Sequence, residues 1–311
     1  MPDLRWGLTI PFAGIPLAEH GDLLSRIEAV GYDDVWTSET AGYDGFTPLA
    51  LAAVHTERLR LATGVVNPFT RGPAVLAQHC AALADASGGR FVLGLGSSSN
   101  VIVERWNGVP FEKPLSRMRA TIEALRPVLA GERGPGGFRL ETPPEAPVPI
   151  VVAALRGKML ALAAELGDGA FTNFLPLSGT RRVAEAFGAP DKELVCRFFC
   201  FPAPEEEALP AARRMLVAYA TVPVYAAFFR WLGWGERIDP MVAAWEQRDR
   251  ARALELVPDE LVREVFLFGD ADAQRERLRA FADDGITTFV LAPVCEPGEV
   301  PAFVEAMAPG R

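Results

Sequence analysis

The chain has 311 residues and a formal net charge of -9 at pH 7; half of its residues are hydrophobic and 23% are charged. This composition is typical of a well-buried globular enzyme and excludes a disordered or fibrous chain. The acidic balance argues against a nucleic-acid surface, which needs clustered Lys and Arg, so we expect a small-molecule substrate as the partner.

The cysteines and histidines indicate neither a disulfide framework nor a metal site. The four cysteines form no C-x-x-C pair, and the three histidines lie far apart in the sequence. Residues 1–15 lack a signal-peptide pattern, and no stretch approaches the ~20 apolar residues that a membrane helix needs. We therefore expect a cytoplasmic protein without a membrane partner.

A recurring unit organises the chain: an Ala/Leu/Glu-rich helix, a glycine, and a short strand of β-branched or aromatic residues. Its copies are 17–30, Gly31 and 34–37; then 158–166, Gly167 and 170–173; then 273–284, Gly285 and 287–291. Glycine fits after each helix because helices commonly end in a left-handed residue, which glycine adopts without steric cost.

Five more apolar runs are short enough to be strands buried on both faces: 4–10, 59–66, 91–95, 149–154 and 194–201. Further helices are predicted over 73–86, 114–129 and 178–187. Eight strands alternating with helices predict one α/β domain over residues 1–311, a (β/α)8 TIM barrel. A doubly wound open sheet is the alternative, but Pro11-Phe12-Ala13-Gly14 follows the first strand in place of a G-x-G-x-x-G turn.

Two segments interrupt the alternation. Residues 131–148 are rich in Gly and Pro and are expected to form a surface loop, with a short hairpin around 138–140. Residues 202–268 form an insertion between strands seven and eight that is too long for an ordinary connection, with helical runs over 205–219 and 240–256 and many aromatic residues. This insertion is interpreted as an extra helical layer or dimer contact, or as a lid over the substrate.

The residues that follow the strands are small, hydroxylic or amide-bearing, with few charges. They include Thr37-Ser38-Glu39-Thr40, Gly96-Ser97-Ser98-Ser99-Asn100 and Thr172-Asn173-Phe174. No catalytic triad, paired carboxylate or metal cluster is evident among them, which suggests that a cofactor carries the chemistry. The Arg156-Gly157-Lys158 turn opens a predicted helix and suits a phosphate, although a solvated charge beside a helix cap is the alternative.

Four motifs, in this order, resemble the bacterial luciferase-like monooxygenase superfamily, and most closely its actinobacterial deazaflavin-dependent oxidoreductases. They are Trp36-Thr37-Ser38-Glu39-Thr40, Gly64-Val65-Val66-Asn67-Pro68-Phe69-Thr70-Arg71, Leu93-Gly94-Leu95-Gly96-Ser97-Ser98 and Ala153-Ala154-Leu155-Arg156-Gly157-Lys158-Met159. The resemblance implies a (β/α)8 barrel that binds the deazaflavin coenzyme F420 and transfers a hydride at its C5. It also implies a possible homodimer.

The resemblance and the strand ends together give the candidate cofactor-binding residues. These are Ser38, Gly64, Val65, Val66, Asn67, Gly96, Ser97, Ser98, Ala153, Ala154, Arg156, Gly157, Lys158 and Asn173. By the resemblance, the Gly64–Val65 peptide bond is cis and supports the face of the ring. Arg71, Trp106 and Asn107 are further candidates for lining the pocket.

Thr40 departs from the family pattern, in which well-studied deazaflavin dehydrogenases carry a histidine after the acid of strand two. Glu39 is therefore the candidate catalytic residue for proton transfer, the alternative being that it only bonds neighbouring backbone. His79, Cys196 and Cys200 are expected to be packing residues.

Three functions remain open. The first is a coenzyme F420-dependent oxidoreductase acting on a small organic substrate. The second is an FMN-dependent monooxygenase; deazaflavin has carbon in place of the ring nitrogen at which reduced flavin reacts with oxygen, so the cofactor decides between hydride transfer and oxygenation. The third is a non-catalytic flavin-binding barrel.

Overall fold

Eight parallel strands close into a barrel in the computed structural model, which describes residues 4–309. The barrel strands are β1 (Arg5–Ile10), β2 (Asp34–Thr37), β3 (Arg60–Thr63), β4 (Phe91–Leu95), β5 (Ile150–Ala153), β6 (Gly169–Asn173), β7 (Glu193–Phe201) and β9 (Thr288–Pro293). Each strand pairs with the next, and β9 pairs with both β7 and β1, so the barrel is closed. The predicted TIM barrel is confirmed, and the open sheet is excluded.

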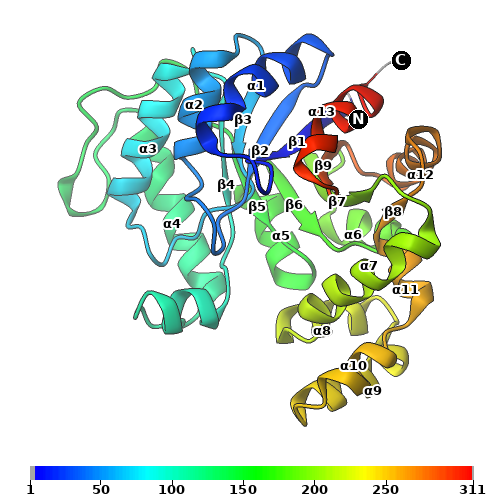
Figure 1. Cartoon of the computed structure of the whole chain (residues 1–311). Coiled ribbons are helices and arrows are strands. Elements are labelled where there is room, and N and C mark those ends of the chain that lie inside the picture. The colour runs from blue at the N-terminus through cyan, green and yellow to red at the C-terminus, as the bar shows by residue number, and fades with distance from the viewer. Residues whose placement is uncertain (1–3, 310–311) are drawn as a thin grey trace.

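Helices surround the strands (Figure 1). They are α1 (His20–Ala29), α2 (Thr47–His55), α3 (Pro73–Ala86), α4 (Pro114–Leu129), α5 (Gly157–Leu166), α6 (Thr180–Phe187), α12 (Ala271–Asp283) and α13 (Val300–Ala306). The predicted bounds of α3 and α4 are confirmed, while α2 and α13 are absent from the predictions. Within residues 4–309, no helix is long and apolar enough to cross a membrane.

Two predicted elements are divided in the structure. The helix predicted over 17–30 begins as a 3-10 turn (Leu17–Glu19) before α1. The strand predicted over 59–66 ends at Thr63, and a cis peptide bond joins Gly64 to Val65 just beyond it; Val66 still bridges to Leu95.

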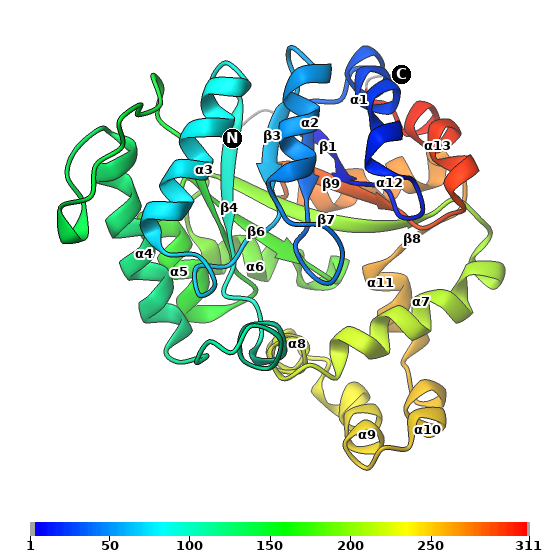
Figure 2. The same cartoon turned by 60° about the vertical axis from the view of Figure 1, so that its left-hand side comes forward.

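The segment 202–268 contains five helices with a hydrophobic cluster of their own. They are α7 (Glu205–Ala220), α8 (Pro223–Trp231), α9 (Gly235–Glu246), α10 (Arg250–Glu255) and α11 (Asp259–Val265), and the two-residue strand β8 (Leu267–Phe268) follows them and pairs with the end of β7. Figure 2 shows α9 and α10 projecting away from the barrel.

The single helix predicted over 240–256 is wrong. Helix α9 begins earlier, at Gly235, and ends at Glu246. Arg248 then adopts a left-handed backbone with φ of 64°, and Asp249 caps α10 by accepting a hydrogen bond from the Arg252 N–H at 2.9 Å. A left-handed residue followed by an N-cap ends one helix and starts another.

The hairpin predicted around 138–140 is also wrong, since no strand forms there. A 3-10 turn (Pro135–Gly137) occupies the segment, and Gly136 and Gly137 both have positive φ. Leu140 is buried and Phe138 packs against the core, so this loop is held by apolar contacts and not by cross-strand pairing.

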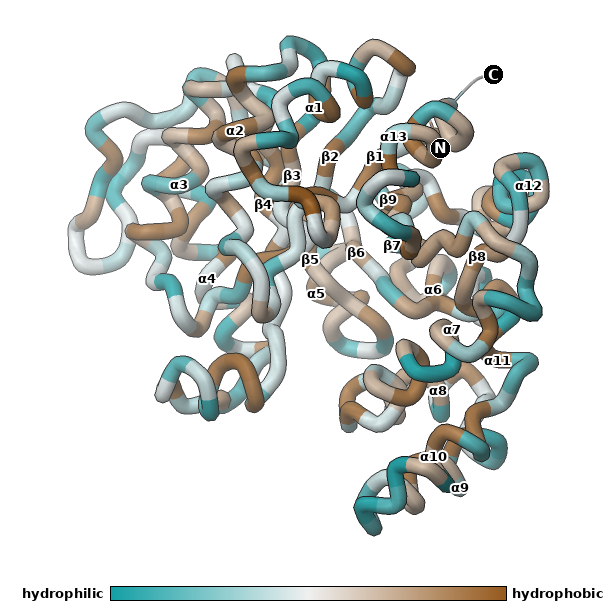
Figure 3. The backbone as a smooth tube through the Cα atoms, viewed as in Figure 1, coloured by the Kyte–Doolittle hydropathy of each residue, from teal (hydrophilic) through white to brown (hydrophobic). Residues whose placement is uncertain are grey.

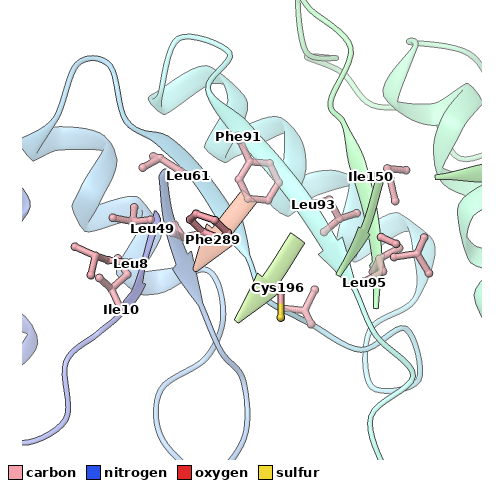
Figure 4. Packing of buried hydrophobic residues seen from close by; sticks show 14 of the residues in the cluster. Leu8, Ile10, Leu49, Leu61, Phe91, Leu93, Leu95, Ile150, Cys196 and Phe289 are labelled. Atoms are coloured by element: carbon pink, nitrogen blue, oxygen red, sulfur yellow. The ribbon is translucent and has the colours of Figure 1, made fainter. Parts of the chain in front are cut away.

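The main core lies between the barrel wall and the helices around it (Figure 4), with Leu8, Leu61, Phe91 and Phe289 buried in one cluster. Helix α12 is largely hydrophilic in Figure 3, and it buries only one face. Cys196 and Cys200 are fully buried, which confirms them as core thiols.

An ion network occupies the amino-terminal end of the barrel. Asp34 is fully buried and accepts hydrogen bonds from Arg5 Nη2 at 2.5 Å and Arg60 Nη2 at 2.8 Å. Arg60 also pairs with Glu193, which accepts a hydrogen bond from Thr288. Burial alone would lower the pKa of Arg60, but Asp34 and Glu193 raise it above its ordinary value. These charges are fully engaged with one another.

Candidate cofactor and substrate site

A cavity of about 1060 Å³ opens at the carboxyl ends of strands β2 to β7. The predicted residues that line it are Ser38, Glu39, Gly64, Val65, Asn67, Gly96, Ser97, Ser98, Ala153, Ala154, Arg156, Gly157, Lys158 and Asn173. Val66 does not line it; its side chain is fully buried and points toward Gly45. Active sites of such barrels lie at this end, so the position of the cavity fits a catalytic role.

A tight turn follows β3 at the wall of the cavity. The Gly64–Val65 bond is cis, as predicted. Asn67 is buried, and its Oδ1 accepts hydrogen bonds from the N–H groups of Phe69 at 3.1 Å and Thr70 at 3.0 Å. The asparagine side chain therefore holds the turn that follows the cis bond.

Glycines at the ends of β3 and β4 allow close contacts inside the barrel. A Cβ atom on Gly96 would lie 2.3 Å from Val65 Cγ2, and one on Gly64 would lie 3.1 Å from Phe171 Cε2. Neither position accepts a larger residue without movement of its neighbours. Because Gly64 and Gly96 have no side chains, the cavity wall is formed by backbone here. Such a surface accommodates a flat ring.

The turn between β5 and α5 presents positive charge and free backbone donors. Gly157 is the first residue of α5 and has a φ of 52°, a left-handed conformation that favours glycine. No side chain caps this helix, and Arg156 and Lys158 are both exposed. Among the described residues, neither of these cations forms an ion pair, so both remain available to an anion.

Glu39 forms a bidentate ion pair with Arg71. The Arg71 Nη1 atom donates to Oε2 at 2.6 Å, and Nη2 donates to Oε1 at 2.5 Å. Both side chains are mostly buried, and Arg71 itself does not line the cavity. Thr40 lies on the cavity wall beside this pair.

The remaining candidates separate into wall and packing residues. Trp106 lines the cavity, whereas Asn107 does not; the Asn107 side chain donates to the Ile102 carbonyl at 2.7 Å. His79 packs on Phe46 with ring centroids 4.3 Å apart, and burial, reinforced by the nearby Arg71 charge, lowers its pKa. His79 is therefore confirmed as a packing residue.

Three polar side chains on the far wall form a hydrogen-bonded chain, of which the sequence predictions include only Asn173. Arg197 Nε donates to Asn173 Oδ1 at 3.3 Å, and Asn173 Nδ2 donates to the Tyr225 hydroxyl at 3.1 Å. Burial raises the pKa of Tyr225 to about 12, so the phenol stays protonated near neutral pH. The signal for Arg197 was present in the sequence, since it is a lone charge inside the apolar run 194–201.

Comparisons with known proteins agree on one family. The family model described as luciferase-like monooxygenase matches residues 6–288. A Mycobacterium tuberculosis protein, provisionally named a coenzyme F420-dependent oxidoreductase, is 29% identical over 93% of this chain and 94% of its own. A 5,10-methylenetetrahydromethanopterin reductase of Methanolobus tindarius is 36% identical over 47% of each chain.

Solved structures share the fold. The coenzyme F420-dependent tetrahydromethanopterin reductase of Methanopyrus kandleri has a TM-score of 0.78 at 20% identity, covering 99% of this chain and 98% of its own. An FMN-bound type II Baeyer–Villiger monooxygenase from Pseudomonas putida has a TM-score of 0.70 at 17% identity, covering 98% of this chain and 97% of its own. The fold is thus common to deazaflavin and flavin proteins.

Proposed function

The chain belongs to the luciferase-like monooxygenase family and is an enzyme, and we propose that it is an oxidoreductase that uses coenzyme F420 to transfer a hydride to or from a small organic substrate. One observation carries the proposal: the large cavity at the catalytic end of the barrel combines a glycine-lined wall with an unpaired cationic helix start. These two features suit a flat ring and a phosphate-bearing tail respectively.

The residues present fit the ring. Gly64, Val65 and Gly96 form a close-packed wall whose backbone would support one face of a planar group. When bound, a deazaflavin would supply a ring carbon that donates or accepts a hydride. The part of this chain is to position the ring, to exclude water and to orient the substrate against it.

The start of α5 fits the tail. Its first N–H groups and the positive end of the helix dipole favour an anion, and Arg156 and Lys158 add charge-assisted donors. Gly157 leaves open space where a side chain would otherwise stand. We assign these three residues to the phosphate of the cofactor.

Glu39 is proposed as the acid-base group, with an orientation that comes from Arg71. The guanidinium donates one hydrogen bond to each carboxylate oxygen, and each oxygen keeps a second lone pair that a substrate proton could reach. The pair thereby fixes the orientation of Glu39 on the cavity wall.

The insertion is proposed as a lid. Tyr219 from α7, Tyr225 from α8 and Trp245 from α9 all line the cavity. They give the cavity an aromatic surface that would exclude water from the reacting groups.

Titration of the purified protein with oxidised deazaflavin and with FMN tests the proposal. We expect deazaflavin to bind at least ~10-fold more tightly, an advantage of about 1.4 kcal/mol. The Lys158→Ala variant should weaken this binding, and Arg139→Ala, which removes an exposed charge outside the cavity, should not. Tighter binding of FMN, with oxygen consumption by the reduced complex, would instead support the monooxygenase; binding of neither would support the non-catalytic barrel.

A further inference from the structure

Arg197 is a half-buried cation on the cavity wall whose hydrogen-bonding capacity is largely unused. Its Nε atom donates to Asn173, and its Cζ atom lies 4.9 Å from the centroid of the Phe199 ring. Within residues 4–309, neither Nη atom has a hydrogen-bond partner, and no carboxylate lies within ion-pair distance. A guanidinium carries five N–H donors, so four of them remain for a ligand in the cavity.

Asn173 fixes the orientation of this group. Because arginine has only donors, the atom of Asn173 that meets Nε must be the carbonyl oxygen. The amide nitrogen is then directed at Tyr225, whose oxygen accepts its hydrogen bond. The phenolic hydrogen of Tyr225 is left free to donate, and Tyr225 also lines the cavity.

We propose that Arg197, with Tyr225 beside it, binds an anionic group of the substrate, a carboxylate or comparable oxyanion. Two Nη atoms in one plane match the two oxygens of a carboxylate, and the phenol adds a third donor. The inference rests on the proposed function, since it names the substrate class of the same cavity.

The anion bound by Arg197 is distinct from the tail of the cofactor. Arg197 lies on β7, two strands away from the β5–α5 turn that carries Arg156 and Lys158. The cavity therefore has two cationic positions on different strands. A substrate anchored at Arg197 and a cofactor anchored at the β5–α5 turn would thus be held from two different strand ends of the same cavity.

Calorimetric titration with benzoate and its neutral analogue benzamide tests the anion site. In the wild-type protein without cofactor, we expect benzoate to bind at least ~10-fold more tightly than benzamide, as charge-assisted hydrogen bonds imply. Arg197→Gln should abolish this preference, Arg197→Lys should keep part of it, and Tyr225→Phe should reduce it. Arg279→Gln, which removes an exposed charge of α12 outside the cavity, should leave it unchanged.

The outcome is separable from that of the cofactor titration. Deazaflavin affinity should be the same in Arg197→Gln and in the wild type, and saturating deazaflavin should not displace benzoate. The proposal is overturned if benzoate shows no preference over benzamide, if Arg197→Gln retains the preference in a protein with native circular dichroism, or if the cofactor competes with benzoate at this position. Failure of deazaflavin to bind would refute the proposed cofactor while leaving the benzoate result to stand on its own.

Discussion

Gly96 is the position at which a single methyl group should have the clearest structural effect. In Gly96→Ala the new Cβ would lie 2.3 Å from Val65 Cγ2. This distance is far shorter than a van der Waals contact, so Val65 or the backbone must move. Overpacking of this kind costs about 1–3 kcal/mol. We predict a loss of that size in the free energy of unfolding, together with weaker deazaflavin binding, because the wall under the ring must move.

A second substitution tests the cause. In the Val65→Ala background the Cγ2 atom is absent, and the next neighbours of the new Cβ are Ala153 Cβ at 3.1 Å and Val65 Cβ at 3.4 Å. These contacts are tight but tolerable, so Gly96→Ala should cost little there. Urea unfolding of the wild type, both single variants and the double variant gives the coupling energy, which we expect to be roughly 1–2 kcal/mol in favour of the double variant. If the two single effects simply add, the contact between Gly96 and Val65 is not the reason for glycine, and the reasoning is refuted.

Four further substitutions test the cofactor site, the ion network and the acid-base group. Lys158→Ala should weaken deazaflavin binding by about 10–100-fold at low salt and less at high salt, whereas the loss in Gly157→Val should be insensitive to salt, as titrations at two ionic strengths will establish. Asp34→Ala should lower the free energy of unfolding by about 3–5 kcal/mol in denaturant melts, since it leaves buried arginine charge uncompensated; a loss below about 1 kcal/mol would contradict that account. Glu39→Gln should reduce turnover by about 100-fold or more while retaining cofactor affinity, and unchanged turnover would limit Glu39 to bonding Arg71 and the loop.

The barrel was predictable because its signals are local and repeated. A glycine after a helix and a short apolar run are together enough to predict strands β2, β4 and β6 to within one residue. Helix α2 was missed although Pro48 and an Ala/Leu run mark it, because its nine residues carry little amphipathic pattern. The division of α9 from α10 depends on the left-handed backbone of Arg248, a conformation that nothing in the residue type announces.

The candidate site was predictable only in part, because some of its residues lie next to strands and others reach it through tertiary contacts. Residues that follow strands, such as Ser97 and Lys158, are brought together by the barrel itself, so their shared location follows from the fold. Tyr225 reaches the cavity from an inserted helix whose placement no local pattern encodes. The pairing of Glu39 with Arg71 joins two loops and depends on their tertiary approach.

Arg60 and Arg197 are both at least partly buried arginines of barrel strands, but they differ in their partners. At the amino-terminal end, Arg60 forms ion pairs with Asp34 and Glu193, and these pairs link β3 to β2 and β7. At the carboxyl end, Arg197 is partly buried, and the neighbours of its guanidinium are the neutral amide of Asn173 and the ring of Phe199. Burial of a charge is unfavourable unless an opposite charge or sufficient hydrogen bonds compensate it. At the same carboxyl end Arg71 is matched by Glu39, so Arg197 is the partly buried arginine of the cavity wall for which a ligand would supply the missing negative charge.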